Sequence, residues 1–477
     1  MAATHVSKRI KDLEAHLKEE DDILFDVIKI FRELDSIAYQ LGIMDSEQSY
    51  ATGVSWWPMV SLMGTFSAGK SAFINSYIGN EIQRTGNQAV DDKFTVISYS
   101  DEEGINTLPG IALDADPRFP FYQFSRAISN TEGGDHRLDG YMQLKTCNCD
   151  ALKGKILIDS PGFDADQQRT TTLRITKHIL DLSDLVLIFF DARHPEPGAM
   201  HDTLQHLVTE TKDRPDANKF MYILNQIDIT AREDNLEEVV AAWQRSLAQA
   251  GLTAGRFYRI YNPDVSVPIE NQAVRERMEA KAKEDIDAIK ERMDQVGTER
   301  AYRIVGILEH SAKEIEHEIV PQLQELIARW RSGTFWTDFS IILLALIGGA
   351  VWWTGAGLTI DQIPQDEITL YWAGGITAAV LLLFHLSVSS LISSSILKNL
   401  RYEVGNERVV KMLSGAFRRN TGFMRSLFMA LGSSRPKGWN NSSRGQVHKV
   451  LADVNLYVRR LNDRFTNPSG KVKAEEK

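Results

Sequence analysis

The chain is predicted to combine an α/β domain built on a mainly parallel sheet with long helices and a pair of membrane-spanning helices. Three observations predict this. Short β-branched runs alternate with helical segments from about residue 55 to about residue 265. Charged segments with apolar residues at three- and four-residue spacing precede and follow that region. Two long stretches without Asp, Glu, Lys or Arg lie close together in residues 339–397.

The segment from about residue 5 to residue 45 is predicted to be helical. Its apolar positions recur every three or four residues with charges between them: Leu24, Val27, Ile28, Phe31, Leu34, Ala38 and Leu41. The first residues contain no apolar core of the kind a secretory signal has, so we expect any membrane signal to lie elsewhere in the chain.

The two uncharged stretches predict a transmembrane hairpin. Residues 339–360 carry no charge, and in residues 368–397 His385 is the one titratable side chain apart from Tyr371. About 20 apolar residues cross a bilayer as a helix. Aromatic residues lie near the expected ends of the spans, where such side chains concentrate: Trp336, Trp352, Trp353, Tyr371 and Trp372. The alternative is a pair of buried core helices in a large soluble protein.

Flanking charges predict how the hairpin is oriented. The short connection DQIPQDE is acidic, whereas Arg329 and Arg331 precede the first span and Lys398 and Arg401 follow the second. Positive charges favour the cytosolic side, so both termini and the α/β domain are expected in the cytosol. A bacterial inner membrane and a eukaryotic organelle membrane both fit this arrangement.

The net charge is unevenly distributed. The whole chain has a formal charge of −10, but residues 398–477 hold 17 Lys and Arg against 6 Asp and Glu. A basic tail predicts an anionic partner. The hairpin favours lipid headgroups, and sparse interleaving of aromatic residues argues against nucleic acid. Residues 404–431 read as a basic amphipathic segment, which either lies in the headgroup layer or packs on other helices.

The sequence Gly64-Thr65-Phe66-Ser67-Ala68-Gly69-Lys70-Ser71 matches the phosphate-binding P-loop pattern and stands between an apolar strand and a helix. Its backbone N–H groups, with Ala72 at the start of the helix, are expected to wrap nucleotide phosphates. Lys70 is expected to reach the β- and γ-phosphates, and the Ser71 hydroxyl to coordinate Mg²⁺.

Two further motifs complete the predicted nucleotide site. The run Ile156-Leu-Ile-Asp159-Ser-Pro-Gly162 is an apolar strand ending in D-x-x-G. Asp159 is expected to hold Mg²⁺ through a water, and the Gly162 N–H to contact the γ-phosphate. The run ending in Asn225-Gln226-Ile-Asp228 follows another buried strand; Asp228 can accept two N–H bonds from guanine while Asn225 braces the neighbouring loop. Together the motifs predict a P-loop GTPase domain.

These motifs resemble the dynamin superfamily. The resemblance rests on four segments: WPMVSLMGTFSAGKSAFINSYIG, RTGNQAVDDKF, DSPGFD and DLVLIFFDA. Within that superfamily the sequence is most similar to the EHD ATPases, over about residues 55–265. It implies assembly on membranes, dimerisation through the nucleotide domain, and coupling of hydrolysis to membrane remodelling. Flanking helices would form a stalk, and the two-span hairpin is similar to the plan of mitofusins. No EH domain follows, so cargo recognition is not implied.

The sequence departs from the family pattern at three places. Phe66 stands where dynamins carry a catalytic glutamine, whereas Ser67 keeps the family residue. The switch threonines align on Val90 and Asp91, which leaves Thr95 as the nearest alternative Mg²⁺ ligand, with Asp91 or Asp92 as groups that could orient water or metal. Gln226 replaces the usual lysine. Because EHD proteins use ATP despite retaining N-K-x-D, Asp228 favours GTP without excluding ATP.

The site needs no covalent step, since a positioned water can attack the γ-phosphate in line. The catalytic candidates are Lys70, Ser67 and Phe66. His194 and His201 are read as surface-loop histidines rather than catalytic groups. Slow basal hydrolysis is expected, rising when a second nucleotide domain completes the site.

The function predicted is that of a membrane-anchored GTPase whose nucleotide-dependent self-assembly remodels its membrane. A membrane-tethered switch that recruits an effector is the alternative. The predicted segments are N-terminal stalk helices (1–54), a dynamin-type G domain (55–265), stalk helices (266–335), the transmembrane hairpin (336–397), the basic juxtamembrane segment (398–432), a linker with a C-terminal bundle helix (433–465) and a disordered tail (466–477).

Overall fold

A computed structural model of the 477-residue chain describes residues 5–85, 93–121, 138–162, 170–193, 217–232, 235–249, 256–262, 269–356, 367–405, 407–427 and 434–466. The chain divides into two compact units. One comprises residues 7–21 and 51–304, here called the sheet unit, and the other comprises residues 1–6, 22–50 and 305–477, here called the helical unit.

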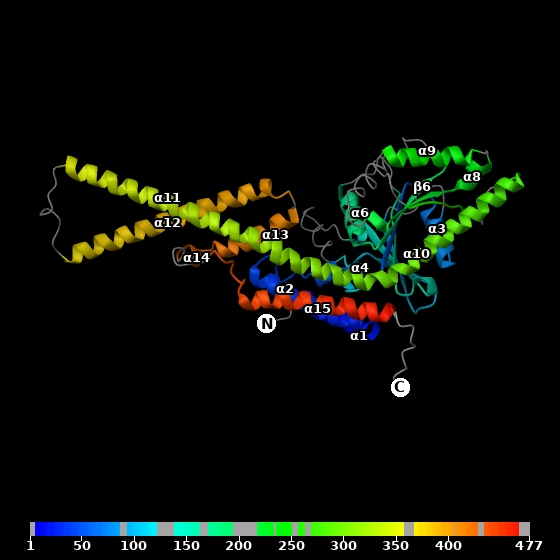
Figure 1. The fold of residues 1–477 in the computed structure, drawn as a ribbon, viewed down its shortest axis with the longest axis horizontal. Coiled ribbons are helices and arrows are strands. Elements are labelled where there is room, and N and C mark those ends of the chain that lie inside the picture. Colours follow the sequence, from blue (N-terminus) through cyan, green and yellow to red (C-terminus); the bar gives the residue numbers. More distant parts are fainter. Residues whose placement is uncertain are drawn as a thin grey trace, which may run out of the picture. The chain divides into compact units, whose positions relative to one another are not determined.

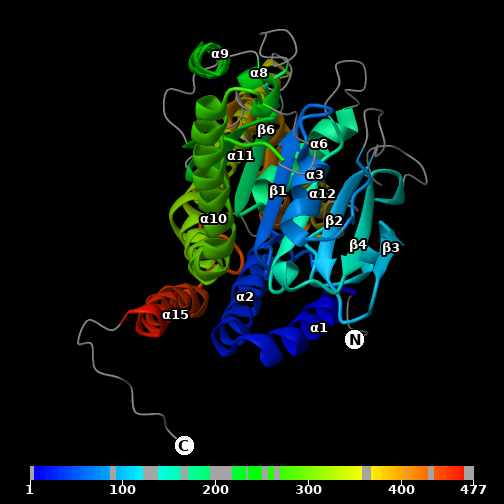
Figure 2. The same ribbon diagram turned by 90° about the vertical axis from the view of Figure 1, so that its right-hand side faces the viewer.

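The sheet unit is built on eight strands in the order β3-β4-β2-β5-β1-β6-β7-β8 (Figure 2). The strands are β1 (Met59–Gly64), β2 (Phe94–Tyr99), β3 (Ile105–Pro109), β4 (Met142–Cys147), β5 (Ile156–Asp159), β6 (Leu185–Asp191), β7 (Phe220–Asn225) and β8 (Arg256–Arg259). All pairs are parallel except β2 with β5 and β3 with β4. The predicted sheet is therefore confirmed as mostly parallel, and it is mixed because β3 pairs antiparallel at one edge and β2 pairs antiparallel with β5 near the centre.

Helices precede, join or follow these strands. They are α1 (His5–Glu20), α3 (Lys70–Ile78), α4 (Ile111–Ala115), α6 (Thr170–Leu182), α8 (Ile227–Arg232), α9 (Leu236–Gln249) and α10 (Gln272–Lys313). Short 3₁₀ turns lie at Ala51–Gly53, Leu138–Gly140, Asp150–Leu152 and Ala217–Lys219.

The core of the sheet unit explains why its central strands are so apolar. Every residue of β1, β5, β6 and β7 is buried, as expected for parallel strands covered on both faces. Ile289, Met293 and Val296 of α10 belong to the same apolar cluster as Val60 and Phe189 of the sheet. The long helix α10 therefore contributes to the nucleotide-domain core as well as extending beyond it.

The helical unit contains α2 (Asp22–Leu41), a π-helical turn (Glu314–Ile319), α11 (Val320–Gly355), α12 (Glu367–Glu403), α13 (Glu407–Asn420), α14 (Phe423–Leu427) and α15 (Asn441–Phe465). Helix α15 packs against α2. Its first turn carries a capping box, in which the Asn440 side chain accepts from the Ser443 N–H and Ser443 accepts from the Asn440 N–H. The long helices that the sequence predicts on either side of the sheet domain are present.

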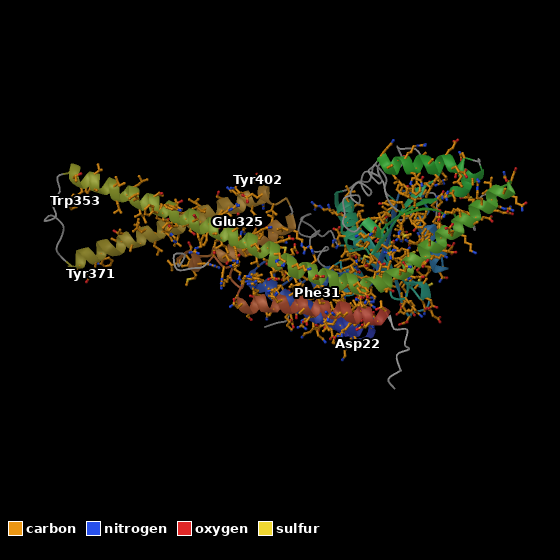
Figure 3. All side chains as sticks on the ribbon, in the orientation of Figure 1. Asp22, Phe31, Glu325, Trp353, Tyr371 and Tyr402 are labelled. Carbon is orange, nitrogen blue, oxygen red and sulfur yellow. The ribbon has the colours of Figure 1, made fainter. Side chains whose placement is uncertain are left out.

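Within the described chain, two helical segments are long and apolar enough to cross a membrane, one ending at Gly355 and the other running from Gly374 to Glu403. Helices α11 and α12 contact each other, and Trp353 and Tyr371 lie toward the end of the pair where α11 ends and α12 begins (Figures 1 and 3). The apolar side chains there are exposed, including Leu344 at 67% and Leu383 at 65%. Among the described residues, this apolar part of the two helices is therefore largely exposed, whereas the first turns of α11 are buried at Leu323, Ile327 and Trp330.

Near their middles, α11 and α12 meet through polar contacts. The His385 ring lies with Nδ1 2.6 Å from Asp338 Oδ2 and Nε2 2.9 Å from the Ser426 carbonyl oxygen. Ser426 also donates to the Ser389 hydroxyl at 2.6 Å, and the Trp330 indole donates to the Ser389 carbonyl at 3.2 Å. These contacts join α11, α12 and α14.

Candidate nucleotide-binding site

The P-loop leaves β1 at Gly64 and enters α3 at Lys70. Ser67 and Gly69 have φ angles of 59° and 85°, which places two residues of the loop in the left-handed region. Gly69 takes this conformation at no steric cost, whereas Ser67 is a non-glycine residue there. Such a chain of turns directs successive N–H groups inward, which is the geometry of an anion-binding loop.

The Lys70 side chain is buried at the floor of the loop. Its ammonium donates to the carbonyl oxygens of Gly64 at 3.1 Å and Thr65 at 3.0 Å. Burial lowers the pKa of Lys70, and the Asp159 carboxylate opposes that shift. An anion in the loop would favour the charged form of the amine, which fits the predicted role of Lys70 in holding phosphate.

Ser71 and Asp159 come together as the motifs predict. The Ser71 hydroxyl donates to Asp159 Oδ2 at 3.0 Å, which links the first turn of α3 to the end of β5. A hydroxyl and a carboxylate are hard oxygen ligands of the type that Mg²⁺ takes, and Mg²⁺ commonly binds to one or two protein groups plus nucleotide phosphates. The described residues contain no cluster of three or more His, Cys, Asp or Glu side chains. The Ser71–Asp159 pair therefore fits a metal shared with a nucleotide.

Thr95 lies in the sheet beside this pair. It faces Asp159 across the antiparallel β2–β5 pairing and faces Gln143 across the parallel β2–β4 pairing. Its side chain is buried and accepts a hydrogen bond from Gln143 Nε2 at 2.8 Å. Its role as a metal ligand stays a prediction. The other switch candidates, Val90, Asp91 and Asp92, lie outside the described residues, as do His194 and His201.

Phe66 and Gly162 are in contact. A Cβ atom built on Gly162 would lie 2.7 Å from Phe66 Cα and 2.9 Å from Phe66 Cβ. The D-x-x-G loop therefore passes so close to the P-loop that only glycine fits without displacement. This contact brings the aromatic residue at the dynamin glutamine position against the loop that is predicted to sense the γ-phosphate.

The third motif braces the P-loop. The buried Asn225 amide donates to the Ala68 carbonyl at 2.9 Å, and Gln226 Nε2 donates to the Ser67 carbonyl at 2.6 Å. A Cβ on Gly69 would lie 2.2 Å from Asn225 Nδ2. Gln226 itself has a φ of 64°. The glutamine in place of lysine thus has a defined partner in the structure, the backbone of Ser67.

Asp228 lies in the first turn of α8 and is buried. Arg193 belongs to none of the nucleotide-binding motifs. Hydrogen bonds to Asp191 raise the pKa of its guanidinium, and the negative charge of Asp228 adds to this effect. The Arg193 guanidinium binds Asp191 at 2.7 Å and donates to the Ser67 carbonyl at 3.3 Å. Arg193 could have been selected from the sequence because it follows the end of β6 by two residues, and ligands of such sheets bind at the carboxyl ends of the strands.

Sequence reasoning also missed Gln83 and Lys145. Gln83 Nε2 donates to Asp159 Oδ2 at 2.6 Å, and Lys145 Nζ donates to Gln83 Oε1 at 2.6 Å. Neither residue belongs to a nucleotide-binding motif. The one signal in the sequence is the lysine itself, the single charged residue in the segment Met142–Cys147, since a charge that becomes buried requires a partner.

Comparison with known proteins finds relatives of the region that contains these motifs. Residues 60–227 match a family model described as the Dynamin family. Human EH domain-containing protein 2 is 25% identical over 198 residues, which cover 40% of this chain and 34% of the relative. Bovine EH domain-containing protein 1 is 27% identical over 178 residues, covering 36% and 31% respectively. The chain thus spans about a third of the length of these relatives.

Solved structures were also compared. An oligomerised bacterial dynamin pair, described as a mechanism for long-range sensing and tethering of membranes, covers 96% of this chain with 12% identity and a TM-score of 0.32. Toc33 from Arabidopsis thaliana, in complex with GDP and Mg²⁺, covers 50% with 13% identity and a TM-score of 0.27. Similarities at this level carry no functional argument.

The family match begins in β1 and ends in α8, so it contains the P-loop, the D-x-x-G loop and Asn225 in one continuous stretch. The side chains of these motifs contact one another in the structure as a nucleotide site requires. Residues 60–227 thus match the Dynamin family model over a stretch that holds P-loop nucleotide-binding motifs.

Proposed function

We propose that the protein is a membrane-anchored dynamin-like GTPase, which hydrolyses GTP to GDP and phosphate and couples nucleotide-dependent self-assembly to membrane remodelling. One observation carries the proposal: the same chain holds a dynamin-family nucleotide site and two long helices whose apolar side chains are exposed. Exposed apolar helices of this length are expected to be covered by lipid.

The nucleotide site supports each part of the proposed reaction. Lys70 and the backbone of residues 64–72 would hold the phosphates, and Asp228 would bind the guanine edge. Ser71 and Asp159 would hold Mg²⁺, which supplies charge neutralisation on the phosphates. Gly162 would contact the γ-phosphate from beside Phe66. Hydrolysis then needs an oriented water and no covalent intermediate.

The membrane part of the proposal places the G domain and both termini in the cytosol. Its support is the asymmetry of charge at the hairpin: Arg329, Arg331, Lys398 and Arg401 flank the spans, and the short connection between them is acidic. The bilayer and a second copy of the G domain are the proposed partners, and residues 398–432 are proposed to lie at the lipid surface.

The test is turnover of GTP and ATP by full-length protein reconstituted in liposomes, measured across protein densities. GTP turnover that rises more than linearly with density supports assembly-coupled hydrolysis. The Lys70→Ala variant should lose both turnover and nucleotide-dependent crosslinking between copies. The Lys93→Ala variant is the matched control, because the Lys93 ammonium donates to the Asp139 carbonyl oxygen rather than to a residue of the P-loop motif.

Other results would redirect the proposal. Turnover per molecule that is independent of density, with unchanged vesicles, would contradict remodelling and favour a tethered GTPase switch that recruits an effector. Preference for ATP over GTP would overturn the assigned nucleotide and place the chain functionally beside the EHD proteins.

A further inference from the structure

The carboxylate predicted to hold Mg²⁺ is fixed by side chains outside the nucleotide-binding motifs. Asp159 Oδ2 accepts hydrogen bonds from two donors, the Ser71 hydroxyl at 3.0 Å and Gln83 Nε2 at 2.6 Å. Ser71 is itself a predicted metal ligand, and its hydroxyl can bind the metal through a lone pair while its O–H still donates to Asp159. Gln83 is a second donor to the same oxygen, and it comes from outside the nucleotide-binding motifs.

Gln83 is itself held firmly from two sides. Its backbone is fixed to α3 by Asn75, whose Nδ2 donates to the Gln83 carbonyl at 2.7 Å and whose Oδ1 accepts from the Gln83 N–H at 2.9 Å. Because α3 also begins with Lys70 and Ser71, Gln83 is bonded to the same helix that carries the last residues of the P-loop. The Gln83 side chain is 3% exposed, which leaves it little freedom.

Lys145 determines which way the Gln83 amide points. Its ammonium donates to Gln83 Oε1 at 2.6 Å and to the Ile82 carbonyl at 3.0 Å. An ammonium can only donate and an ionised carboxylate can only accept. The amide oxygen must therefore face Lys145, and the amide nitrogen must face Asp159.

The sheet brings these groups to one face. Lys145 follows Gln143 by two residues on β4, so both side chains point the same way from the strand. Gln143 is in register with Thr95, and Thr95 is in register with Asp159. Lys145 is 8% exposed and Asp159 5% exposed, so this chain of contacts is shielded from water, where such hydrogen bonds are strong.

We propose that Gln83 and Lys145 are positioning residues for the Mg²⁺ site: Lys145 fixes the Gln83 amide, and Gln83 fixes the Asp159 carboxylate. Neither residue touches the nucleotide in this proposal. Partners of this kind around a metal ligand typically contribute about 10–100-fold to metal affinity or activity. The proposal rests on the nucleotide site alone and is independent of whether the protein remodels membranes.

The experiment measures binding of a fluorescent GDP analogue to full-length protein, first in EDTA and then as Mg²⁺ is added. For Gln83→Leu and Lys145→Met, the Mg²⁺ concentration that gives half of the metal-dependent increase in affinity should rise by about tenfold or more. Affinity in EDTA should stay within about twofold of wild type, because the phosphate-binding loop is unchanged.

Lys219→Met is the matched control. Lys219 is also a buried lysine of the same unit that donates to a backbone carbonyl, that of Leu180, at 2.7 Å. It should leave the Mg²⁺ dependence unchanged. If Lys145→Met does not fold, Lys145→Gln serves instead, since it keeps a donor for Gln83; it should give a smaller shift in the same direction.

Two results would overturn the proposal. Wild-type Mg²⁺ dependence in folded Gln83→Leu or in the folded Lys145 variant would show that Asp159 does not need this support. An equal loss of affinity in EDTA and in Mg²⁺ would show a general structural role. Neither result bears on density-dependent turnover in liposomes, so failure here is distinguishable from failure of the proposed function.

Discussion

Gly162 of the D-x-x-G loop lies directly against Phe66 of the P-loop, and a Cβ atom at position 162 would come within 2.7 Å of Phe66 Cα. The two residues belong to motifs nearly 100 positions apart in the chain. Their contact means that the loop predicted to sense the γ-phosphate cannot carry a side chain without moving away from the phosphate-binding loop.

The Gly162→Ala variant should therefore lower GTP turnover at least about tenfold, equivalent to about 1.4 kcal/mol in activation free energy. The added methyl would displace the D-x-x-G loop from Phe66 and from the expected γ-phosphate position. Steady-state phosphate release checks this, with Gly140→Ala as control, because a Cβ at Gly140 meets no atom within 4 Å. Equal rates for the two variants would contradict the importance of this contact.

Local motifs made the P-loop, Asp159 and Asn225 predictable from the sequence. In each case an apolar strand leads into a short loop whose residue types are dictated by phosphate, metal or loop contacts. The structure places the Ser71–Asp159 and Asn225–Ala68 contacts where those motifs require them. Strand periodicity and β-branched runs were likewise enough to predict the parallel centre of the sheet.

The contacts of Gln83 and Lys145 could not be predicted in the same way. They depend on β2 lying between β4 and β5, parallel to β4 and antiparallel to β5. No local sequence pattern predicts which strands are neighbours in the sheet. Gln226 was recognised as a departure from the usual lysine, but its bond to the Ser67 carbonyl depends on a left-handed backbone at a non-glycine residue. Such features emerge from tertiary packing rather than from residue spacing.

The Asn225→Ala variant should weaken nucleotide binding by about tenfold. Asn225 is buried and donates to the Ala68 carbonyl at 2.9 Å, and loss of such a bond leaves a buried acceptor unpaired at a cost of about 1–3 kcal/mol. Fluorescent-nucleotide titration measures the effect. Asn148→Ala is a suitable control, since its exposed amide also donates to a carbonyl, that of Asp101. A nucleotide affinity equal to that of wild type in the Asn225→Ala variant would show that binding does not depend on this bond to the P-loop.

A pH-dependent contribution to stability is expected from Asp35 on α2. Burial raises the pKa of this carboxyl to about 6, against the opposing hydrogen bonds from Ser49 and the Tyr50 N–H. A folded-state pKa above the unfolded value of 3.8 means that its contribution is present at low pH and is lost as pH rises through about 6.

The Asp35→Asn variant removes that titration. Its stability relative to wild type should therefore improve by about 1 kcal/mol between about pH 5 and about pH 8. Thermal unfolding of both proteins in detergent at the two pH values measures the change. Asp26→Asn is the control, because Asp26 is a partly exposed acid on the same helix that pairs with Lys29. If the stability of Asp35→Asn relative to wild type stays constant or falls as pH rises, the pKa of Asp35 is not raised in the folded protein.

The His385 contacts predict how α14 is held to the hairpin. The ring lies 2.6 Å from Asp338 Oδ2 on α11 and 2.9 Å from the Ser426 carbonyl on α14. Replacing it with leucine removes the bonds to both oxygens, and hydrogen bonds of this kind contribute about 0.5–1.5 kcal/mol each. Amide hydrogen exchange in residues 423–427 should accelerate about tenfold or more in His385→Leu protein in liposomes. Ser387→Ala is the control, because the exposed Ser387 hydroxyl bonds only within α12, to the Leu383 carbonyl. Unchanged exchange in His385→Leu would mean that α14 is held by its apolar and serine contacts, with the histidine bond contributing little.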